Sequence, residues 1–190
     1  MRLSPEGEIL IRSPGKFSGY YRQPELTAAS FTEDGFFRTG DLGERRPDGL
    51  LKITGRAKEL FKTDKGKYVA PAPIENRLNV HPMVELSLVS GVGRPAAYGL
   101  VVLAEDIRAR VVDANFRRVV EAELTGLLRQ LNDDLADYER LRMLVVVPEP
   151  WTIESGCLTP TMKVRRAAIE ARVAPHLDDW YSSDRPVLWM

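Results

Sequence analysis

The chain has 190 residues, with 27 basic side chains (Lys and Arg) and 27 acidic ones. This length allows one domain, or one domain and a piece of another, and the balanced charge argues against a broad basic face for nucleic acid. No signal-peptide pattern opens the sequence, and no apolar run is long enough to span a bilayer. Because Cys157 is the single cysteine, no disulfide can form within the chain, which fits a reducing, cytoplasmic setting.

Residues 1–57 are predicted to be rich in β-structure. Short apolar runs alternate with turn signals such as Pro47-Asp48-Gly49, a pattern typical of small strands and hairpins. The best strand candidates are residues 8–11 and 50–54. A short helix is expected over residues 24–30, where Pro24 can occupy the first turn.

Residues 58–190 are predicted to form an α+β domain, a small mixed sheet with covering helices. A hairpin is expected over residues 58–69, around the turn Asp64-Lys65-Gly66. Apolar, β-branched runs indicate strands, and apolar residues at helical spacing indicate helices. The expected strands are 84–90, 100–103 and 143–147, and the expected helices are 73–80, 116–135 and 164–181, the last interrupted near Pro175.

The run from Leu158 to Arg166 places one lysine after a Thr-Pro-Thr turn. Pro160 disfavours helix at Thr159, and Thr161 can cap the helix that follows. Lys163 is therefore expected on a short exposed loop, as a compact cation suited to neutralising phosphate. Taken alone, this pattern is weak evidence for a role in phosphate binding, because a lysine beside a helix is usually a solvated surface residue.

Two further segments make the pattern specific. One runs from Gly19-Tyr20-Tyr21 to Thr39-Gly40-Asp41, and the other from Gly55-Arg56-Ala57-Lys58-Glu59 to Pro73-Ile74-Glu75-Asn76. In this order, ending with Leu158-Thr159-Pro160-Thr161-Met162-Lys163, they resemble the adenylate-forming acyl-CoA synthetases, in particular the long-chain fatty-acid CoA ligases. The resemblance implies that residues 58–190 are the mobile C-terminal lid domain and that residues 1–57 end a large adenylation domain.

The glycine-rich phosphate loop and the Tyr-Gly-x-Thr-Glu segment of these enzymes do not occur in the sequence. We therefore interpret the chain as the C-terminal part of a longer enzyme, and expect it to be inactive alone. The resemblance implies that the whole enzyme joins a fatty acid to ATP, forms acyl-AMP and then makes the CoA thioester, with ATP, CoA and Mg²⁺. No metal site and no stably bound cofactor are expected in this part.

The resemblance also assigns roles to individual residues. Lys163 would be the catalytic lysine of adenylation, stabilising charge on the transferring phosphate. Asp41 would accept hydrogen bonds from the two ribose hydroxyls of ATP, beside Gly40, which lets backbone approach a ligand. Arg56 would be a second ribose or phosphate contact, although a structural ion pair with a nearby acid is the alternative. Lys62 would contact phosphate.

The lid of this family rotates between two poses, and the resemblance places the hinge at Lys58. After rotation, the hairpin with Gly66 and Lys67 would line the CoA tunnel. The stretch Thr63-Asp64-Lys65-Gly66 departs from the family's Ser/Gly-Gly pattern, so detailed CoA contacts are left open.

Two other functions stay open from the sequence. One is an acyl-AMP ligase that feeds a carrier protein, and the other is a binding or regulatory module that keeps the lid fold without catalysis. A carrier-linked amino-acid adenylation domain is disfavoured, because Met162 stands before Lys163 where those domains have glycine. Apolar surface on residues 1–54, without a parent domain, can drive dimerisation, and peripheral membrane contact of the whole enzyme is left open.

Overall fold

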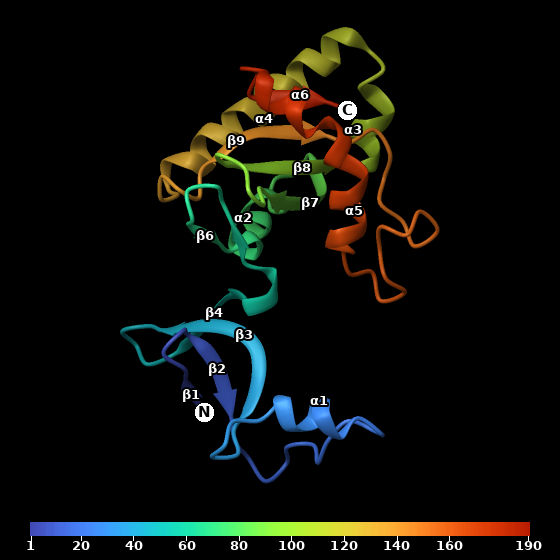
Figure 1. Cartoon of the computed structure of the whole chain (residues 1–190). Helices are drawn as coiled ribbons and strands as arrows, with labels where there is room; N and C mark the ends of the chain where they lie inside the picture. The colour runs from blue at the N-terminus through green and yellow to red at the C-terminus, as the bar shows by residue number, and fades with distance from the viewer. The chain divides into compact units, whose positions relative to one another are not determined.

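The computed structural model describes residues 1–190, which divide into two units, Met1–Leu60 and Phe61–Met190 (Figure 1). The division falls three residues after the boundary expected between residues 57 and 58. No helix has both the length and the apolar character needed to cross a membrane.

The first unit is an antiparallel sheet with one short helix. Its strands are β1 (Arg2–Leu3), β2 (Glu8–Ile11), β3 (Phe37–Arg45) and β4 (Leu51–Arg56), side by side in that order. Helix α1 (Pro24–Ala29) starts on a proline, as predicted, and a 3-10 turn (Ala57–Glu59) follows β4. No strand was predicted at β3, which pairs with both β2 and β4 and runs through the Thr39-Gly40-Asp41 segment.

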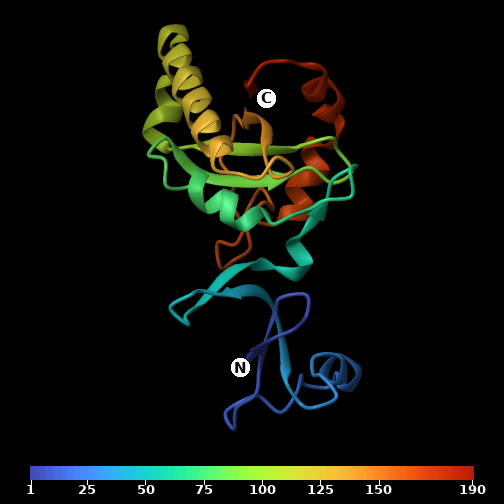
Figure 2. The same cartoon turned by 90° about the vertical axis from the view of Figure 1, so that its left-hand side faces the viewer.

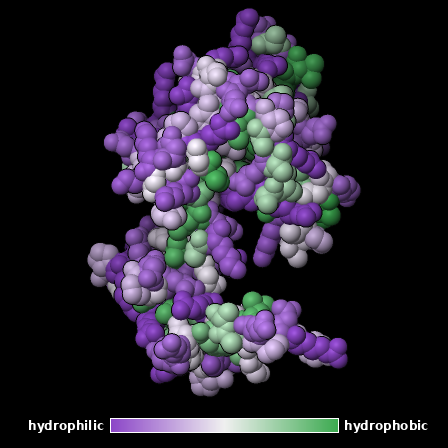
Figure 3. All heavy atoms as spheres, in the orientation of Figure 1, coloured by the Kyte–Doolittle hydropathy of each residue, from purple (hydrophilic) through white to green (hydrophobic).

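The first unit buries little apolar surface of its own. Ile9 and Leu10 are its buried hydrophobic side chains, whereas Tyr21 and Ile53 are 82% and 65% exposed. Four aromatic rings, of Phe17, Tyr20, Phe31 and Phe37, pack on one another with centroids 4.9–5.7 Å apart. Apolar side chains are visible on its surface in Figure 3. Whether this surface drives dimerisation stays a prediction.

The second unit is built on a mixed four-stranded sheet in the order β10-β9-β8-β7. β7 and β8 are antiparallel, while β8, β9 and β10 run parallel to one another. A two-stranded hairpin precedes the sheet. Strand bounds are β5 (Phe61–Lys62), β6 (Tyr68–Val69), β7 (Val84–Ser90), β8 (Ala97–Leu103), β9 (Leu141–Val146) and β10 (Val187–Trp189).

Helices cover both faces of this sheet (Figure 2). Alternate residues along a strand point to opposite faces, so Val89 and Val101 pack with the helices on one face, and Leu88 and Leu100 with those on the other. Helices α2 (Pro71–Leu78), α3 (Glu105–Arg110) and α4 (Ala114–Asp133) contribute to the first core, and α5 (Arg166–Val173) and α6 (Leu177–Ser182) to the second. The predicted α+β class, a mixed sheet with covering helices, is confirmed.

Most predicted elements are present, with local differences. Asp113 caps α4 by accepting hydrogen bonds from the Asn115 and Phe116 amides, so this helix begins two residues before the expected start. The last helix is interrupted at Pro175 by a 3-10 turn, as predicted. Helix α3 and strands β1, β3 and β10 were not predicted. β10 has three residues, and its pairing with β9 defines it rather than a local pattern.

Candidate functional site

Lys163 stands at the end of a tight hairpin turn. The Met162 amide donates to the Thr159 carbonyl at 2.8 Å, and the Thr159 amide donates to the Lys163 carbonyl at 2.8 Å. With Pro160 second in the turn and Met162 left-handed at φ 60°, this is a type I turn closed by a left-handed residue. Lys163 is exposed, as expected, and its ammonium makes no hydrogen bond or ion pair within the chain.

The expected cap at Thr161 is wrong. Helix α5 begins at Arg166, with Arg165 at the N-cap position and no side chain capping it. The hydroxyls of Thr159 and Thr161 lie 3.0 Å apart, and the Thr159 hydroxyl accepts from the Lys163 amide at 3.0 Å. The threonines therefore stabilise the turn rather than the helix.

The base of the Lys163 hairpin is held by the core. Leu158 and Val164 form an antiparallel bridge, and the Arg165 amide donates to the Cys157 carbonyl at 2.8 Å. Cys157 and Leu158 are 1% and 3% exposed. Cys157 is thus a packed, free thiol, and the turn projects from a fixed base.

The hairpin between β5 and β6 repeats this turn geometry. The Gly66 amide donates to the Thr63 carbonyl at 3.0 Å, and the Thr63 amide donates to the Lys67 carbonyl at 2.9 Å. Gly66 takes the left-handed place at φ 76°, and Lys67 follows it as Lys163 follows Met162. Both turns therefore begin on a threonine and present a lysine at the same place.

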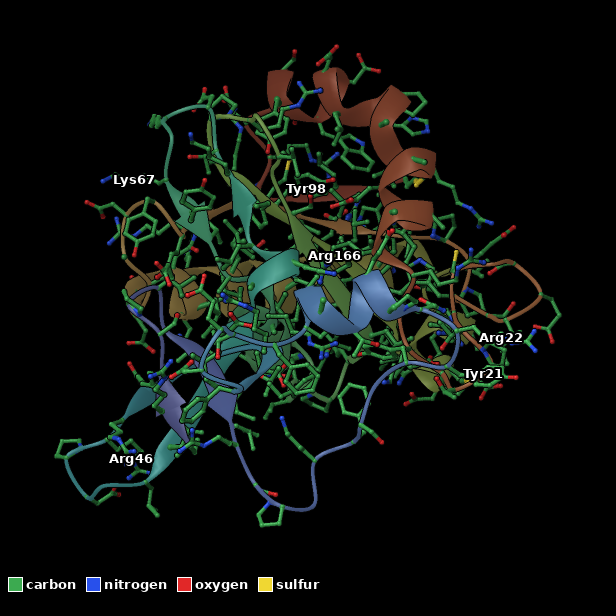
Figure 4. The ribbon with its side chains drawn as sticks, turned by 60° about the horizontal axis from the view of Figure 1, so that its bottom comes forward. Tyr21, Arg22, Arg46, Lys67, Tyr98 and Arg166 are labelled. Carbon is green, nitrogen blue, oxygen red and sulfur yellow. The ribbon has the colours of Figure 1, made fainter.

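The cations of the β5–β6 hairpin face solvent. Lys62, Lys65 and Lys67 are exposed, and the Lys62 ammonium lies 5.7 Å from the centre of the Tyr68 ring. Lys67 lies at the rim of its unit in Figure 4. In Figure 1 this hairpin and the Lys163 turn lie on opposite sides of the second unit.

Asp41, expected to bind ribose, and Arg56, expected to contact ribose or phosphate, pair with each other in the first unit. They are opposite one another on β3 and β4, and the Arg56 Nε lies 2.7 Å from Asp41 Oδ1. The hydrogen bond to Asp41 raises the pKa of the Arg56 guanidinium above its ordinary value. Both the ion-pair alternative and a ligand role remain compatible with this contact, because Asp41 Oδ2 and the terminal nitrogens of Arg56 have no partner in the chain.

Glu8 orders the segment of β3 that carries Asp41, a contact that no local sequence pattern predicted. Its Oε1 accepts from the Gly40 amide at 3.0 Å, and its Oε2 lies 3.1 Å from Arg38 Nη1. The Thr39 hydroxyl donates to the Ile9 carbonyl and accepts from the Asp41 amide at 3.1 Å. Gly40 has φ 74°, a left-handed conformation that suits glycine.

An open groove of about 560 Å³ lies beside this segment of β3, within the first unit. It is lined by the Gly40 backbone, by Arg56 and by Lys58, together with apolar side chains from α1 and β3. Lys58 sits in the 3-10 turn Ala57–Glu59, just before the boundary at Leu60, and makes no ion pair. Its role as a hinge stays a prediction.

The predicted residues therefore fall into three groups. Asp41, Arg56 and Lys58 belong to the first unit. In the second, Lys62, Gly66 and Lys67 share one hairpin, and Lys163 stands alone on another.

A family model, the AMP-binding enzyme C-terminal domain, matches residues 59–185. The chain belongs to this family. Long-chain-fatty-acid–CoA ligase FadD15 of Mycobacterium tuberculosis is 34% identical over 196 residues, covering 97% of this chain and 32% of the relative. The chain thus spans about a third of the length of that relative. The resemblance found in the motifs is confirmed.

Two solved adenylation domains are similar in fold to this chain. The adenylation domain of a carboxylate reductase from Mycobacterium chelonae matches with a TM-score of 0.79 and 30% identity. The match covers 93% of this chain and 28% of the reductase chain. The adenylation domain of the carboxylic acid reductase from Segniliparus rugosus, in complex with AMP and a co-purified carboxylic acid, has a TM-score of 0.77 and 30% identity, covering 94% of this chain and 29% of its own.

Proposed function

We propose that this chain is the C-terminal part of a fatty acyl-CoA synthetase, which makes acyl-AMP from a carboxylic acid and ATP and then the CoA thioester. The observation that carries the proposal is Lys163, an exposed and unpaired ammonium on a rigid turn, in a chain 34% identical to a long-chain fatty-acid CoA ligase. Alone, the chain would be inactive.

Lys163 would act in the first half-reaction. When the carboxylate attacks the α-phosphorus of ATP, negative charge develops on oxygens that are already anionic. A fixed cation aimed at this centre lowers the barrier. The turn bonds at Thr159 fix the backbone of Lys163 before ATP arrives, so little ordering of the backbone is left for the reaction step.

Asp41 and Arg56 would bind the nucleotide. Arg56 holds one carboxylate oxygen of Asp41, which orients the carboxylate and leaves Oδ2 to accept from a ribose hydroxyl. The terminal nitrogens of Arg56 would donate to ribose or phosphate oxygens. No group of three His, Cys, Asp or Glu side chains gathers in this chain.

The second half-reaction would use the β5–β6 hairpin. The repeated turn geometry supports this, because both hairpins present a lysine directly after a left-handed residue. A rotation at Lys58 would exchange the two lysines at the reacting centre, and Gly66, Lys67 and Lys62 would then lie along the path of CoA.

The test joins the chain to its complete large domain and measures both half-reactions. Lys163→Met is expected to slow fatty-acid-dependent exchange of pyrophosphate into ATP by about 10²–10³-fold, the loss typical of one electrostatic group. Thioester formation from supplied acyl-AMP should change little. Lys52→Met, which removes an exposed lysine paired with Glu44, is the matched control. Full exchange activity in Lys163→Met contradicts the proposal.

The similarity to carboxylate reductase adenylation domains favours a second candidate. In that case the same acyl-AMP would pass to an acceptor other than CoA, such as a carrier protein. Acyl-AMP formation with no thioester on added CoA would identify this function. If neither acyl-AMP nor thioester forms with the large domain present, the remaining function is that of a binding module.

A further inference from the structure

Helices α2 and α5 are joined by a partly buried cluster that no step described above uses. Glu75 of α2, Arg166 of α5 and the backbone of Val89 in β7 form a closed ring of hydrogen bonds. Arg166 Nη2 lies 2.7 Å from Glu75 Oε1, Arg166 Nη1 donates to the Val89 carbonyl at 2.8 Å, and the Val89 amide donates to Glu75 Oε1 at 2.7 Å. We call these three residues the edge clamp.

The edge clamp is built into the unit rather than laid on its surface. The side chains of Arg166 and Glu75 are 22% and 14% exposed, and Val89 is fully buried. β7 is the outermost strand of its sheet, so these two side chains satisfy backbone groups of Val89 that no further strand can pair. Breaking such a pair leaves a charge and two backbone groups without partners.

The position of the clamp in the chain links it to both lysine turns. Arg166 is the first residue of α5, three residues after Lys163, and Glu75 lies on α2, the helix that directly follows the β5–β6 hairpin. One turn along α5, Glu170 accepts from the Ser90 hydroxyl at 2.6 Å, so the start of α5 is fixed to the end of β7 at two points. In Figure 4 Arg166 lies inward from the rim where Lys67 stands.

We propose that Arg166 and Glu75 are positioning residues for Lys163. By fixing the first turn of α5 to β7, Arg166 sets where the Lys163 turn stands relative to the β5–β6 hairpin. Loss of Arg166 removes the side-chain contacts that join the start of α5 to β7 and loosens the base of the Lys163 turn. The β5–β6 hairpin keeps its own anchor, because Ile74 and Leu78 of α2 stay packed in the core. This inference rests on the proposed function of Lys163, but the physical link can be measured without it.

Hydrogen exchange on this chain measures that link. In Arg166→Met, the amides of Thr159 and Arg165, which close the base of the Lys163 turn, are expected to exchange about tenfold faster than in the parent chain. The amides of Thr63 and Gly66 in the other hairpin should be unchanged. Unchanged protection at Thr159 and Arg165, or equal loss in both hairpins, overturns the positioning role whatever the activity of the whole enzyme.

The half-reactions of the enzyme with its complete large domain supply the second readout. Arg166→Met should lower the kcat of acyl-AMP formation by about 10-fold to 100-fold, because small misplacement of a catalytic group has effects of this size. The KM for ATP and thioester formation from supplied acyl-AMP should stay within about twofold, a split that a general loss of stability does not give. Arg77→Met, which removes another α2 ion pair, with Asp134 at 2.6 Å, is the control.

The conservative variant Glu75→Gln separates geometry from charge. The Gln carbonyl can still accept from both Val89 and Arg166, so most activity should be retained, whereas Glu75→Ala should resemble Arg166→Met. If Arg166→Met loses activity equally in both half-reactions, or loses no more than Arg77→Met, the proposal is overturned. If the parent enzyme itself makes no acyl-AMP, the proposed function fails, and hydrogen exchange alone decides the positioning role.

Discussion

Met162→Gly should stabilise the second unit, because Met162 occupies a conformation that favours glycine. Its φ of 60° is left-handed, while Gly66 holds the equivalent place in the other hairpin at 76°. A residue with a Cβ loses about 1–2 kcal/mol there. Glycine also increases the entropy of the unfolded chain, which offsets about 0.4–1 kcal/mol of that gain in stability. Since the Met162 side chain is 64% exposed, little burial is lost, and a net gain of about 0.5–1 kcal/mol is expected.

The assay is urea unfolding of this chain followed by tryptophan fluorescence, since Trp151, Trp180 and Trp189 all lie in the second unit. The midpoint should rise with an unchanged slope. The reverse change, Gly66→Met, is the matched control and should lower the midpoint. A Cβ at Gly66 would meet the Lys62 side chain at an ordinary 3.6 Å, so its cost comes from the backbone alone. A lower midpoint for Met162→Gly, or no loss in Gly66→Met, refutes the reasoning.

Three further changes test the core, the pH response and the second hairpin. Leu144→Ala, at a fully buried site on β9, should cost about 2–5 kcal/mol in urea unfolding. Burial raises the pKa values of Tyr98 and Tyr181. Above about pH 10 these two side chains therefore lose their protons in the unfolded state before they do so in the folded state. The free energy of unfolding should then fall by about 1.4 kcal/mol per pH unit for each tyrosine. Tyr181→Phe should make that fall shallower, and an unchanged slope would argue against the assignment. Lys67→Met, in the enzyme with its large domain, should slow thioester formation from supplied acyl-AMP by about tenfold while sparing acyl-AMP formation. Equal effects on both half-reactions would contradict separate roles for the two lysines.

Elements with strong local patterns could be predicted from the sequence. The apolar spacing of Val120, Leu124, Leu128 and Leu131 predicted helix α4, and all four side chains are buried. The motifs likewise predicted the family, and the exposed loop at Lys163 follows from Pro160. Thr161 was misjudged because two local structures compete for a threonine at this place, and hydrogen bonds within the turn take precedence over helix capping.

Contacts between distant residues could not be predicted. Glu75 and Arg166 are 91 residues apart, and Glu8 and Gly40 are 32 apart. Each pairing depends on how strands and helices meet in three dimensions, and a glutamate that binds a neighbouring strand has the same local pattern as one that faces water. The ion pair of Asp41 and Arg56 was foreseen only as an alternative, because the β3–β4 register that places them opposite each other is a tertiary result.

The edge clamp also bears on how the second unit avoids joining other copies of itself. An outer strand with free backbone groups is a template for pairing with a strand of another molecule, and proteins commonly block such edges with charged side chains. Glu75 and Arg166 occupy the backbone groups of Val89 in the apolar strand β7, with charged groups at its open side. The residues that hold the Lys163 turn in place would thus also protect the chain from aggregation through its sheet edge. Loss of the edge clamp would therefore lower both activity and resistance to aggregation.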